Sequence, residues 1–496
     1  MGAQLAAFVY SAIAFASIYC VARFVGTFSR SSLEWVVIAF FVTSFLFFLL
    51  SPAVLTFLLA AIFLLIVANR LSITQRICFF LGCLPAVSQQ ANYLVPAVGI
   101  DYLLLLQYPL LLSLAVLAPI IPQLIGGAGR DRLASHSLLL WVLFFYLGVD
   151  FATDVRDSSL TNGIRHLFID FFIYVLPIFA IVSFTPSLVV FQRYFSALII
   201  GLLLACGLAI MHQLIGWKFS SAVIADLDLS KSFHNVYDYR GGLIRSGGTI
   251  MPIPFGILCS ISFVWLLSLA NYRWLSWRAA AMWILLLGVA ISGSRAAFLV
   301  IPVALSSIWI LNRIKPTMTG ILFLFLGLMF AGYTLGEVVI ALDPLGTFSY
   351  RAEMLRSSIP VFASNPIFGA PSEVYLVPLE HMRQGQGIID IVNSYIQIGL
   401  KSGLLGLMSF IGVWLLTFRS IAKGYFLAAS SPSLRSMLVL QAALLCVLVA
   451  SLFSVSLVDY LPQYYWVFIG LSLGLANVAN SSDRVDVTKV AYPTQP

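Results

Sequence analysis

Apolar runs recur along the whole chain and are separated by short polar segments. The runs lie at about 5–22, 34–50, 52–69, 77–92, 104–121, 136–149, 166–184, 195–214, 250–270, 278–292, 296–312, 319–341, 397–417, 437–458 and 461–478. Most of them are long enough to cross the hydrocarbon layer of a bilayer as α-helices. The pattern therefore predicts an all-α fold, a polytopic transmembrane helical bundle of about 14–15 helices with a large external loop.

The composition supports this class. Of the 496 residues, 61% are hydrophobic and 9% are charged, and the mean hydropathy is +1.01, whereas soluble domains carry about 25% charged residues. All six cysteines fall inside apolar runs, which predicts packing roles rather than a disulfide framework or a zinc site. The chain has no glycine motif of a nucleotide site, so no cofactor is expected.

Charged residues sort by sign between alternate loops. One set of loops carries most of the basic residues, such as Arg130 with Arg132 and Arg419 with Lys423, whereas the other set is slightly acidic. Because basic loops stay in the cytoplasm, we expect the N-terminus outside and the C-terminus inside. The net charge of +8 therefore indicates topology and does not indicate a nucleic acid partner.

The longest connections all fall on the outer side, and long loops in compact proteins are usually functional. They lie at about 150–165, 215–249 and 342–396. The predicted organisation is N-terminal transmembrane helices (1–214), an external loop with an arginine motif (215–249), transmembrane helices with a Gly-Ser-Arg turn (250–341), a large external or periplasmic loop (342–396), C-terminal transmembrane helices (397–478) and a cytoplasmic tail (479–496).

Four short motifs follow one another in these outer segments. They are Arg245-Ser-Gly-Gly248, Ser292-Gly-Ser-Arg295, Asn365-Pro-Ile-Phe-Gly369 downstream of Arg351, and Asn393-Ser-Tyr395 before Gly403-Leu-Leu-Gly406. Arg295 stands between two apolar runs, where a guanidinium costs several kcal/mol unless an anion or a cavity receives it. The motifs therefore predict an anion site on the outer face.

This ordered set resembles the O-antigen ligase and Wzy-type polymerase superfamily of bacterial membrane proteins. The resemblance covers roughly residues 240–417, and the helix count agrees with it over the whole length. One position departs from the pattern, because Val392 stands where ligases of the family carry a His before Asn-Ser-Tyr. That His is the proposed general base of the ligases, so its absence favours a polymerase.

The resemblance implies a polysaccharide polymerase that joins polyprenyl-pyrophosphate-linked oligosaccharide repeat units by metal-independent glycosyl transfer, on the outer face of the bacterial inner membrane. Cationic groups would stabilise the leaving pyrophosphate, and a carboxylate would serve as base. The candidate catalytic residues are Arg295, Arg245, Arg351 and Asp390, and the candidate substrate-binding residues are Asn393, Tyr395, Arg240 and Arg356. Further candidate partners are a chain-length regulator and a flippase of the same pathway.

Other interpretations stay open. Arg295 could reach lipid headgroups, Arg351 could form a structural ion pair, and Asp390 could cap a helix. Lys401 is expected to anchor its helix at the membrane interface. Glu373, Glu380 and His381 are the other outer candidates for the base. A ligase that passes the glycan to another acceptor is the closest alternative function, and a flippase or transporter is a more distant one.

Overall fold

The structure is a computed structural model, and the residues that it describes are 53–86, 92–97, 100–216, 239–240, 243–269, 277–327, 347–383, 389, 391–455 and 461–490. The helices expected at 5–22 and 34–50 lie outside these residues. The chain divides into two compact units, each built from two stretches of sequence. Unit 1 comprises residues 1–130 and 172–302, and unit 2 comprises residues 131–171 and 303–496.

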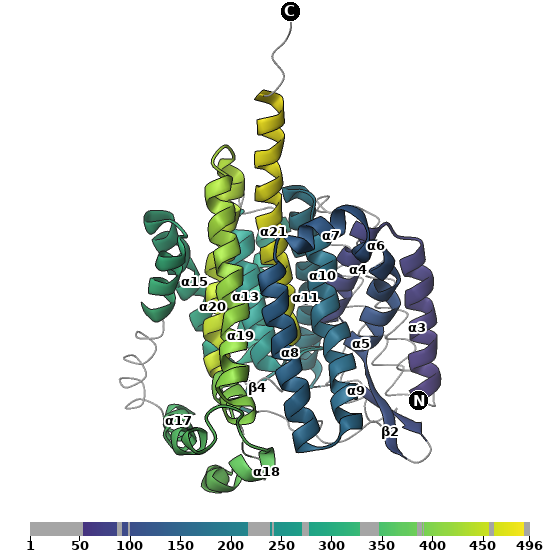
Figure 1. The fold of residues 1–496 in the computed structure, drawn as a ribbon, viewed down its shortest axis with the longest axis vertical. Helices are drawn as coiled ribbons and strands as arrows, with labels where there is room; N and C mark the ends of the chain where they lie inside the picture. The colour runs from purple at the N-terminus through teal and green to yellow at the C-terminus, as the bar shows by residue number, and fades with distance from the viewer. Residues whose placement is uncertain are drawn as a thin grey trace, which may run out of the picture. The chain divides into compact units, whose positions relative to one another are not determined.

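Unit 1 contains most of the helices from the first half of the chain (Figure 1). Its elements are α3 (Ala53–Asn69), α4 (Ile73–Ala86), β1 (Asn92–Ala97), β2 (Ile100–Gln107), α5 (Tyr108–Leu112), the π-helix η1 (Ser113–Leu117), the 3-10 helix η2 (Ala118–Ile120), α6 (Ile121–Ile125), the start of α7 (Gly127–Ala134), the π-helix η3 (Phe171–Val175), α10 (Leu176–Ser183), α11 (Leu188–Ile215), β3 (Tyr239–Arg240), β4 (Leu243–Ile244), α13 (Pro252–Ser268), α14 (Trp277–Ser292) and the start of α15 (Arg295–Ile314).

Small residues let the helices of unit 1 approach one another closely. A side chain at Gly288 of α14 would lie 2.7 Å from the Cys206 thiol of α11 and 3.1 Å from the Cys259 thiol of α13. The five described cysteines are buried and free, which confirms packing roles for them. Phe195 of α11 stacks on Trp265 of α13, with 4.5 Å between the ring centroids. This close packing holds α11, α13 and α14 together.

Unit 2 consists of a helical hairpin and the helices of the C-terminal half (Figure 1). Its elements are α8 (Ser137–Asp157), α9 (Leu160–Asp170), the rest of α15, a helix at Met318–Gly327, α17 (Thr347–Ser364), α18 (Ser372–Tyr375), the 3-10 helix η4 (Val377–Met382), α19 (Ser394–Leu427), α20 (Pro432–Ser451), the 3-10 helix η5 (Leu452–Ser454) and α21 (Leu461–Val490). Aromatic rings from three helices form its core, including Tyr146, Phe410 and Trp466.

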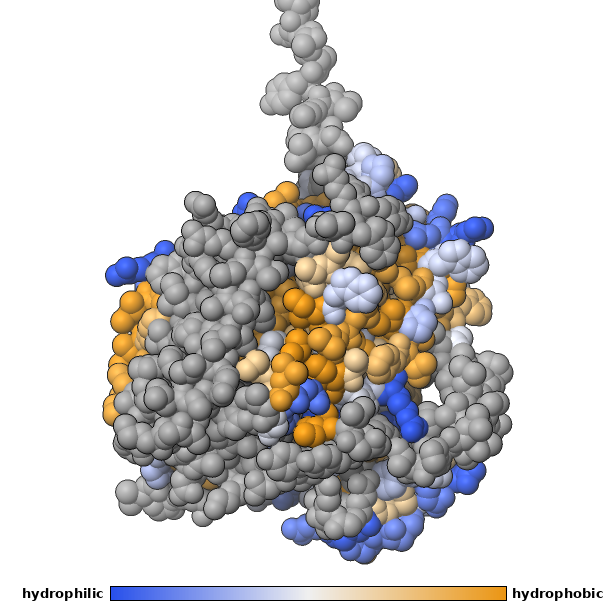
Figure 2. Space-filling view, turned by 180° about the vertical axis from the view of Figure 1, so that it is seen from behind, coloured by the Kyte–Doolittle hydropathy of each residue, from blue (hydrophilic) through white to orange (hydrophobic). Residues whose placement is uncertain are grey.

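The all-α, polytopic class is confirmed. Among the described residues, seven helices are long and apolar enough to cross a membrane, and five shorter apolar helices accompany them. Apolar side chains cover much of the described surface seen in Figure 2. Large ones such as Trp141 on α8 and Trp309 on α15 are 73% and 62% exposed, as expected for side chains that face lipid.

The prediction of a long outer connection at 150–165 is wrong, because nearly all of these residues are helical. The α8 helix continues to Asp157, and α9 begins at Leu160, where the Ser159 hydroxyl caps it by accepting a hydrogen bond from the Asn162 amide. Charged side chains on one face of a helix lower the local hydropathy without ending the helix. The predicted loop is therefore a tight helical hairpin whose polar residues lie on helix surfaces.

Strands β1 and β2 form a second departure from the expected helices. They pair in an antiparallel manner, with Asn92 opposite Gln107 and Val95 opposite Leu104. The predicted helix at 77–92 consequently ends at Ala86, and the one predicted from 104 begins at Tyr108, with Pro109 in its first turn. A leucine-rich run has the same hydropathy in either conformation, so this strand was not recognisable from hydropathy. At the other end of the chain, α21 continues to Val490, into the tail expected from residue 479.

Candidate functional site

The structure brings Arg245 directly onto the Ser-Gly-Ser-Arg turn. Nε of Arg245 donates a hydrogen bond to the carbonyl oxygen of Ser292 at 3.1 Å. The neighbouring amide of Ser246 donates to the carbonyl oxygen of Ile291 at 3.2 Å. Two of the sequence motifs therefore meet in unit 1, although 47 residues separate Arg245 from Ser292.

The Arg245 segment is held in place by buried polar contacts with α11 and α4. The Ser246 hydroxyl lies 2.8 Å from Nδ1 of His212, near the end of α11, and both residues are buried. Thr249 is fully buried and donates to the carbonyl oxygen of Pro85, at the end of α4. Buried hydroxyls need such partners, so these contacts hold the segment against α11 and α4.

Gly293 allows the close approach of Arg245. Its φ of +58° lies in the left-handed region, which L side chains rarely adopt. A Cβ atom there would lie 2.9 Å from Cγ of Arg245. The turn therefore needs glycine for two reasons, its backbone conformation and the space taken by the arginine stem.

Arg295 is exposed and is the first residue of α15. The Ser294 hydroxyl caps this helix by accepting from the Ala297 amide at 3.4 Å. The N-terminus of a helix carries partial positive charge and free N–H groups, so a cation there is unfavourable unless an anion is bound nearby. A role for Arg295 in anion binding stays a prediction.

Arg351 and Arg356 lie in unit 2, on α17. Arg351 is half-buried, and its Nη2 donates to the carbonyl oxygen of Ser454 at 3.5 Å. Arg356 is exposed. Arg240 lies in β3, where its backbone pairs with Leu243. Roles in substrate binding or catalysis for these three arginines stay predictions.

The Asn-Ser-Tyr motif forms the start of α19. The side chain of Asn393 caps the helix by accepting from the amides of Tyr395 and Ile396 at 3.0 and 3.1 Å. The Tyr395 hydroxyl is engaged inside the bundle, where it donates to the carbonyl oxygen of Val449 at 2.8 Å. Ser394 donates to the carbonyl oxygen of Val455 at 2.6 Å. These contacts assign the motif a structural part in placing the helix end.

The candidate base Asp390 lies outside the described residues. The alternatives are all exposed on the segment that follows α17. Glu380 forms an ion pair with Arg383, and the hydrogen bond from Arg383 lowers the pKa of this carboxyl. Nε2 of His381 lies 3.2 Å from the Ser357 hydroxyl, and its Nδ1 lies 3.1 Å from the Pro378 carbonyl oxygen. A carboxylate with a lowered pKa is a weaker base, which disfavours Glu380.

The Asn-Pro-Ile-Phe-Gly motif docks onto a kink in α19. At Gly403 the backbone leaves the helical conformation, with φ 62° and ψ −157°. The amide of Leu404 then donates to the carbonyl oxygen of Pro366 at 2.7 Å, and the amide of Leu405 to that of Ile367 at 3.3 Å. In return, the amide of Ala370 donates to the carbonyl oxygen of Leu400 at 2.8 Å. The third and fourth motifs thus form backbone hydrogen bonds with each other, in place of the helical hydrogen bonds that the kink breaks.

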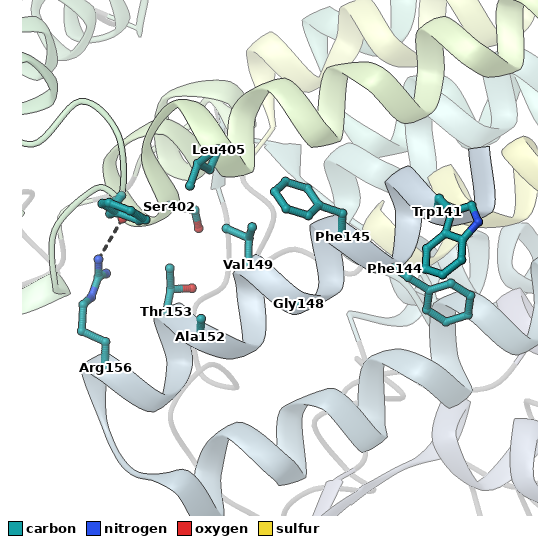
Figure 3. A pocket seen from close by; sticks show the side chains of 11 residues that line it. Trp141, Phe144, Phe145, Gly148, Val149, Ala152, Thr153, Arg156, Ser402 and Leu405 are labelled. Atoms are coloured by element: carbon teal, nitrogen blue, oxygen red, sulfur yellow. Dashed lines mark hydrogen bonds between the residues drawn. The ribbon is translucent and has the colours of Figure 1, made fainter. Parts of the chain in front are cut away.

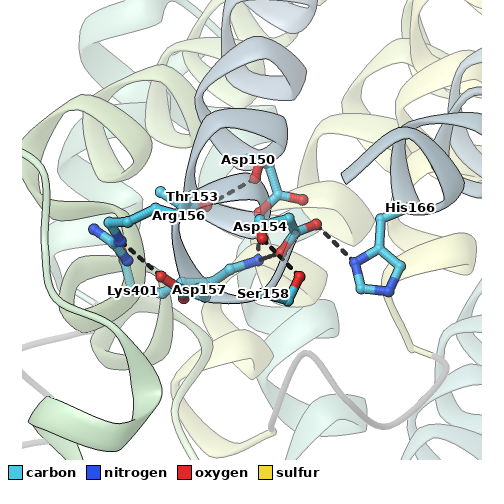
Figure 4. A network of polar contacts seen from close by, with 8 residues as sticks. All are labelled: Asp150, Thr153, Asp154, Arg156, Asp157, Ser158, His166 and Lys401. Carbon is cyan, nitrogen blue, oxygen red and sulfur yellow. Dashed lines mark hydrogen bonds and ion pairs between the residues drawn. The ribbon is translucent and has the colours of Figure 1, made fainter. Parts of the chain in front are cut away.

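Arg156, which the sequence analysis did not single out, donates further hydrogen bonds to both sides of this junction. Its Nη2 donates to the carbonyl oxygen of Lys401 and its Nη1 to that of Phe368, both at 2.9 Å. Its Nε donates to Asp157 at 2.6 Å (Figure 4). The planar guanidinium suits two carbonyl groups at once, and it joins α8 to both α19 and the docked motif.

Lys401 lies in an ion-pair network, whereas its expected place at the membrane interface stays a prediction. Its ammonium lies 2.8 Å from a carboxylate oxygen of Asp150 and 2.8 Å from one of Asp154 (Figure 4). The other oxygen of Asp154 lies 2.8 Å from Nδ1 of His166. Asp150 and Asp154 are four residues apart, so they share one face of α8. That spacing is the signal in the sequence that could have revealed the network.

A groove runs along the other side of α8 (Figure 3). Its volume is about 640 Å³, and aromatic side chains line one end, whereas Arg156 and Ser402 lie at the other. Among the described residues, no cluster of three or more His, Cys, Asp or Glu side chains is arranged to hold a metal ion.

Comparison with known proteins gives one family match. Residues 280–411 match the family described as O-antigen ligase. This region begins in α14, contains Arg295, Arg351 and the docked Asn-Pro-Ile-Phe-Gly motif, and ends in α19. No curated protein matches the chain. The chain is thus a multi-pass membrane protein, by the length and composition of its described helices, and its residues 280–411 are similar to the O-antigen ligase family.

Proposed function

We propose that this protein is a glycosyltransferase that joins oligosaccharide repeat units carried on polyprenyl pyrophosphate, on the outer face of the cytoplasmic membrane. The observation that carries the proposal is the contact between Arg245 and the Ser292 carbonyl, which holds one guanidinium against the turn that bears Arg295. Two cations beside a helix N-terminus suit a pyrophosphate diester.

The proposed reaction breaks the bond between the anomeric carbon of the donor glycan and its pyrophosphate oxygen. The bonding electron pair leaves with the pyrophosphate, whose negative charge increases. A hydroxyl oxygen of the acceptor glycan forms the new glycosidic bond, and its proton passes to a base. Guanidinium groups held in place before the reaction stabilise the leaving group without reorganisation. Arg245 and Arg295 would have this role, and Arg351 is proposed as a third contributor from its place in the family motifs.

The base is proposed to be Asp390, two residues before Val392. The ligases of the family use a His at the Val392 position, so this chain must place its base elsewhere. Asp390 fits in chemistry and in sequence position. Arg240 and Arg356 are proposed to contribute to substrate binding, and Asn393 and Tyr395 are proposed to contribute to it by placing the start of α19.

A ligase that passes the glycan to another acceptor is the alternative function, and the match to the O-antigen ligase family is compatible with both. The missing His favours the polymerase. Accumulated intermediates separate the two: loss of a polymerase leaves single repeat units on the carrier, whereas loss of a ligase leaves full-length chains on it. A flippase forms no glycosidic bond, so a purified flippase would neither join repeat units nor transfer chains to an acceptor.

The test uses membranes that contain the full-length protein and lipid-linked repeat units. Arg295→Ala and Arg245→Ala are expected to lower kcat about a hundredfold to a thousandfold, because each removes one donor to the leaving group. Arg295→Lys should recover part of the rate, since an ammonium keeps the charge and loses the bidentate geometry. Arg313→Lys is the matched control, because Arg313 lies at the opposite end of α15, over the Trp309 ring. Parental rates in both alanine variants, at equal protein levels, would contradict the proposal.

A further inference from the structure

The last turn of α11 holds the residues on both sides of Arg245. Nδ1 of His212 lies 2.8 Å from the Ser246 hydroxyl, and the side-chain amide of Gln213 donates a hydrogen bond to the carbonyl oxygen of Ile244. His212 and Gln213 are consecutive in the sequence, and Arg245 stands between their two partners. Two neighbouring side chains of one helix therefore fix the backbone directly before and directly after this arginine.

One face of α11 is built to receive the segment that follows Arg245. Ala205, Ala209, His212 and Gln213 are spaced by four, three and one residues, so they share a face of the helix. A Cβ atom at Gly248 would lie 2.2 Å from the carbonyl oxygen of Ala205 and 3.3 Å from the amide nitrogen of Ala209. The segment thus packs directly on the small residues of this face, and the two polar side chains lie at the end of the same face.

Ser246 joins this contact to the Ser-Gly-Ser-Arg turn. Its hydroxyl contacts His212 of α11, whereas its amide donates to the carbonyl oxygen of Ile291 of α14 at 3.2 Å. His212 and Ser246 are both buried, and a hydrogen bond in such a site is not readily replaced by one to water. Loss of the imidazole would therefore release the residue next to Arg245 from α11.

From these contacts we infer that His212 and Gln213 are positioning residues, which hold Arg245 at the turn before Arg295. The inference rests on the proposed function, because it assigns both residues to the same reaction. They act through the backbone around Arg245 and not on the substrate itself. A guanidinium stabilises a leaving group best when it is fixed before the reaction begins, and a small misplacement lowers the rate steeply. All of these residues belong to unit 1.

The first test is a double-mutant cycle in the full-length protein, with rates referred to the amount of folded protein. His212→Leu is expected to lower kcat about tenfold and to leave the KM for the lipid-linked donor unchanged, because the lost contact matters only in the transition state. Arg245→Ala alone should lower kcat about a hundredfold or more. Adding His212→Leu to Arg245→Ala should lower kcat no further, since no guanidinium is left to position. A further tenfold loss in the double variant would overturn the inference.

Conservative variants separate positioning from general stability. His212→Asn places an amide near the position of Nδ1 and should keep most of kcat, whereas His212→Gln places it near Nε2 and should behave like His212→Leu. Gln213→Met removes the donor to Ile244 and should also lower kcat. Tyr194→Phe is the matched control, because it removes a buried hydrogen bond, to the carbonyl oxygen of Phe184 at 2.6 Å, from the other end of α11. Equal losses of kcat in the Asn, Gln and Leu variants of His212 would overturn the inference.

The second test does not depend on activity. Amide hydrogen exchange of the peptide that contains Ser246 should be faster in His212→Leu than in the parent, because the amide of Ser246 is then less firmly held against Ile291. Tyr194→Phe should leave this exchange unchanged. Parental exchange in His212→Leu would overturn the inference even if the protein joins repeat units. Faster exchange in a protein that forms no glycosidic bond would show that His212 positions the segment and would contradict the proposed function alone.

Discussion

Nη2 of Arg156 donates a hydrogen bond at 2.9 Å to the carbonyl oxygen of Lys401. In a regular helix that oxygen would accept from the amide of Leu405, which here donates to Ile367 because α19 kinks at Gly403. Arg156 therefore satisfies an acceptor that the kink leaves open. One side chain of α8 thus stabilises the irregular backbone on which two family motifs meet.

Replacing Arg156 should destabilise this junction. Arg156→Lys keeps the charge and loses the planar fork that serves two carbonyl groups, so we expect a loss of about 1–3 kcal/mol in the free energy of unfolding. Thermal unfolding in detergent measures the loss. Arg383→Lys alters an exposed ion pair and should leave Tm unchanged. Equal Tm values for Arg156→Lys and the parent would contradict this role.

The kink itself requires glycine. Gly403→Ala should cost about 1–3 kcal/mol, because its φ of 62° and ψ of −157° belong to a region that L residues avoid. Gly399→Ala is a matched control in the same helix, since its Cβ would meet Phe362 at an ordinary 3.5 Å. A Cβ atom at Gly403 would also clash with the Ile367 carbonyl group and the Gly369 amide nitrogen, so the difference between the two Tm values measures the backbone strain and this clash together. A larger loss for Gly399→Ala would show that the kink is not strained for L residues.

Lys401 keeps two carboxylates together, so its removal should be costly. Lys401→Met would leave Asp150 and Asp154 facing each other without a cation, which we expect to cost about 2–4 kcal/mol. The double variant Lys401→Met with Asp154→Asn should be less destabilised than the single variant, because one of the repelling charges is gone. Urea unfolding of the reconstituted protein measures both. Simple addition of the two single-variant effects would exclude coupling.

Gly293 should matter to activity through Arg245. Gly293→Ala adds a Cβ atom 2.9 Å from Cγ of Arg245, so it should displace the guanidinium and lower kcat about tenfold or more. Gly216→Ala imposes a similar backbone strain, at φ +65°, where a Cβ atom meets nothing within 4 Å. Both variants should lose stability, but only the first should lose activity at a temperature where both are folded. Full activity of the folded Gly293→Ala variant would show that the reaction does not depend on the position of Arg245.

His136 predicts a pH dependence of stability. Burial beside Asn477 and Ser420, with Lys423 nearby, lowers the pKa of this imidazole from 6.5 to about 4. The unfolded chain therefore binds more protons than the folded one between these values, and stability falls as pH drops from about 6.5 to about 4. Comparing Tm at pH 7 and pH 5 measures this. His136→Gln should reduce the change of Tm between the two pH values. An unchanged difference in Tm would show that other groups cause the pH dependence.

Hydropathy predicted the fold class because burial in lipid selects for long apolar runs, and the helices around Arg295 agree with it within a few residues. Hydropathy failed at Asp150, Asp154 and Asp157. Their charges lie on one face of a helix, but they lower the hydropathy averaged along the chain to a value typical of a loop. It also failed at residues 92–107, because pairing with a neighbouring strand is not visible in either strand alone.

The candidate site was predictable to the extent that its residues carry motifs. The order of the motifs predicted that Arg245 and Arg295 belong to one site, and the structure brings Arg245 onto the turn that precedes Arg295. The kink at Gly403 and its exchange of hydrogen bonds depend on backbone geometry, which no residue pattern specifies. The contacts of Arg156 and the ion pairs of Lys401 were not predicted, because their partners lie up to 251 residues away in the sequence.

The same 251-residue separation between Asp150 and Lys401 has a consequence for biosynthesis. The ribosome delivers α8, with its carboxylates, long before α19 supplies the ammonium that balances them. Until then α8 carries uncompensated charge, which makes its insertion into the bilayer less favourable. The hairpin of α8 and α9 should therefore remain beside the translocon, or with its polar end in water, until the C-terminal helices arrive.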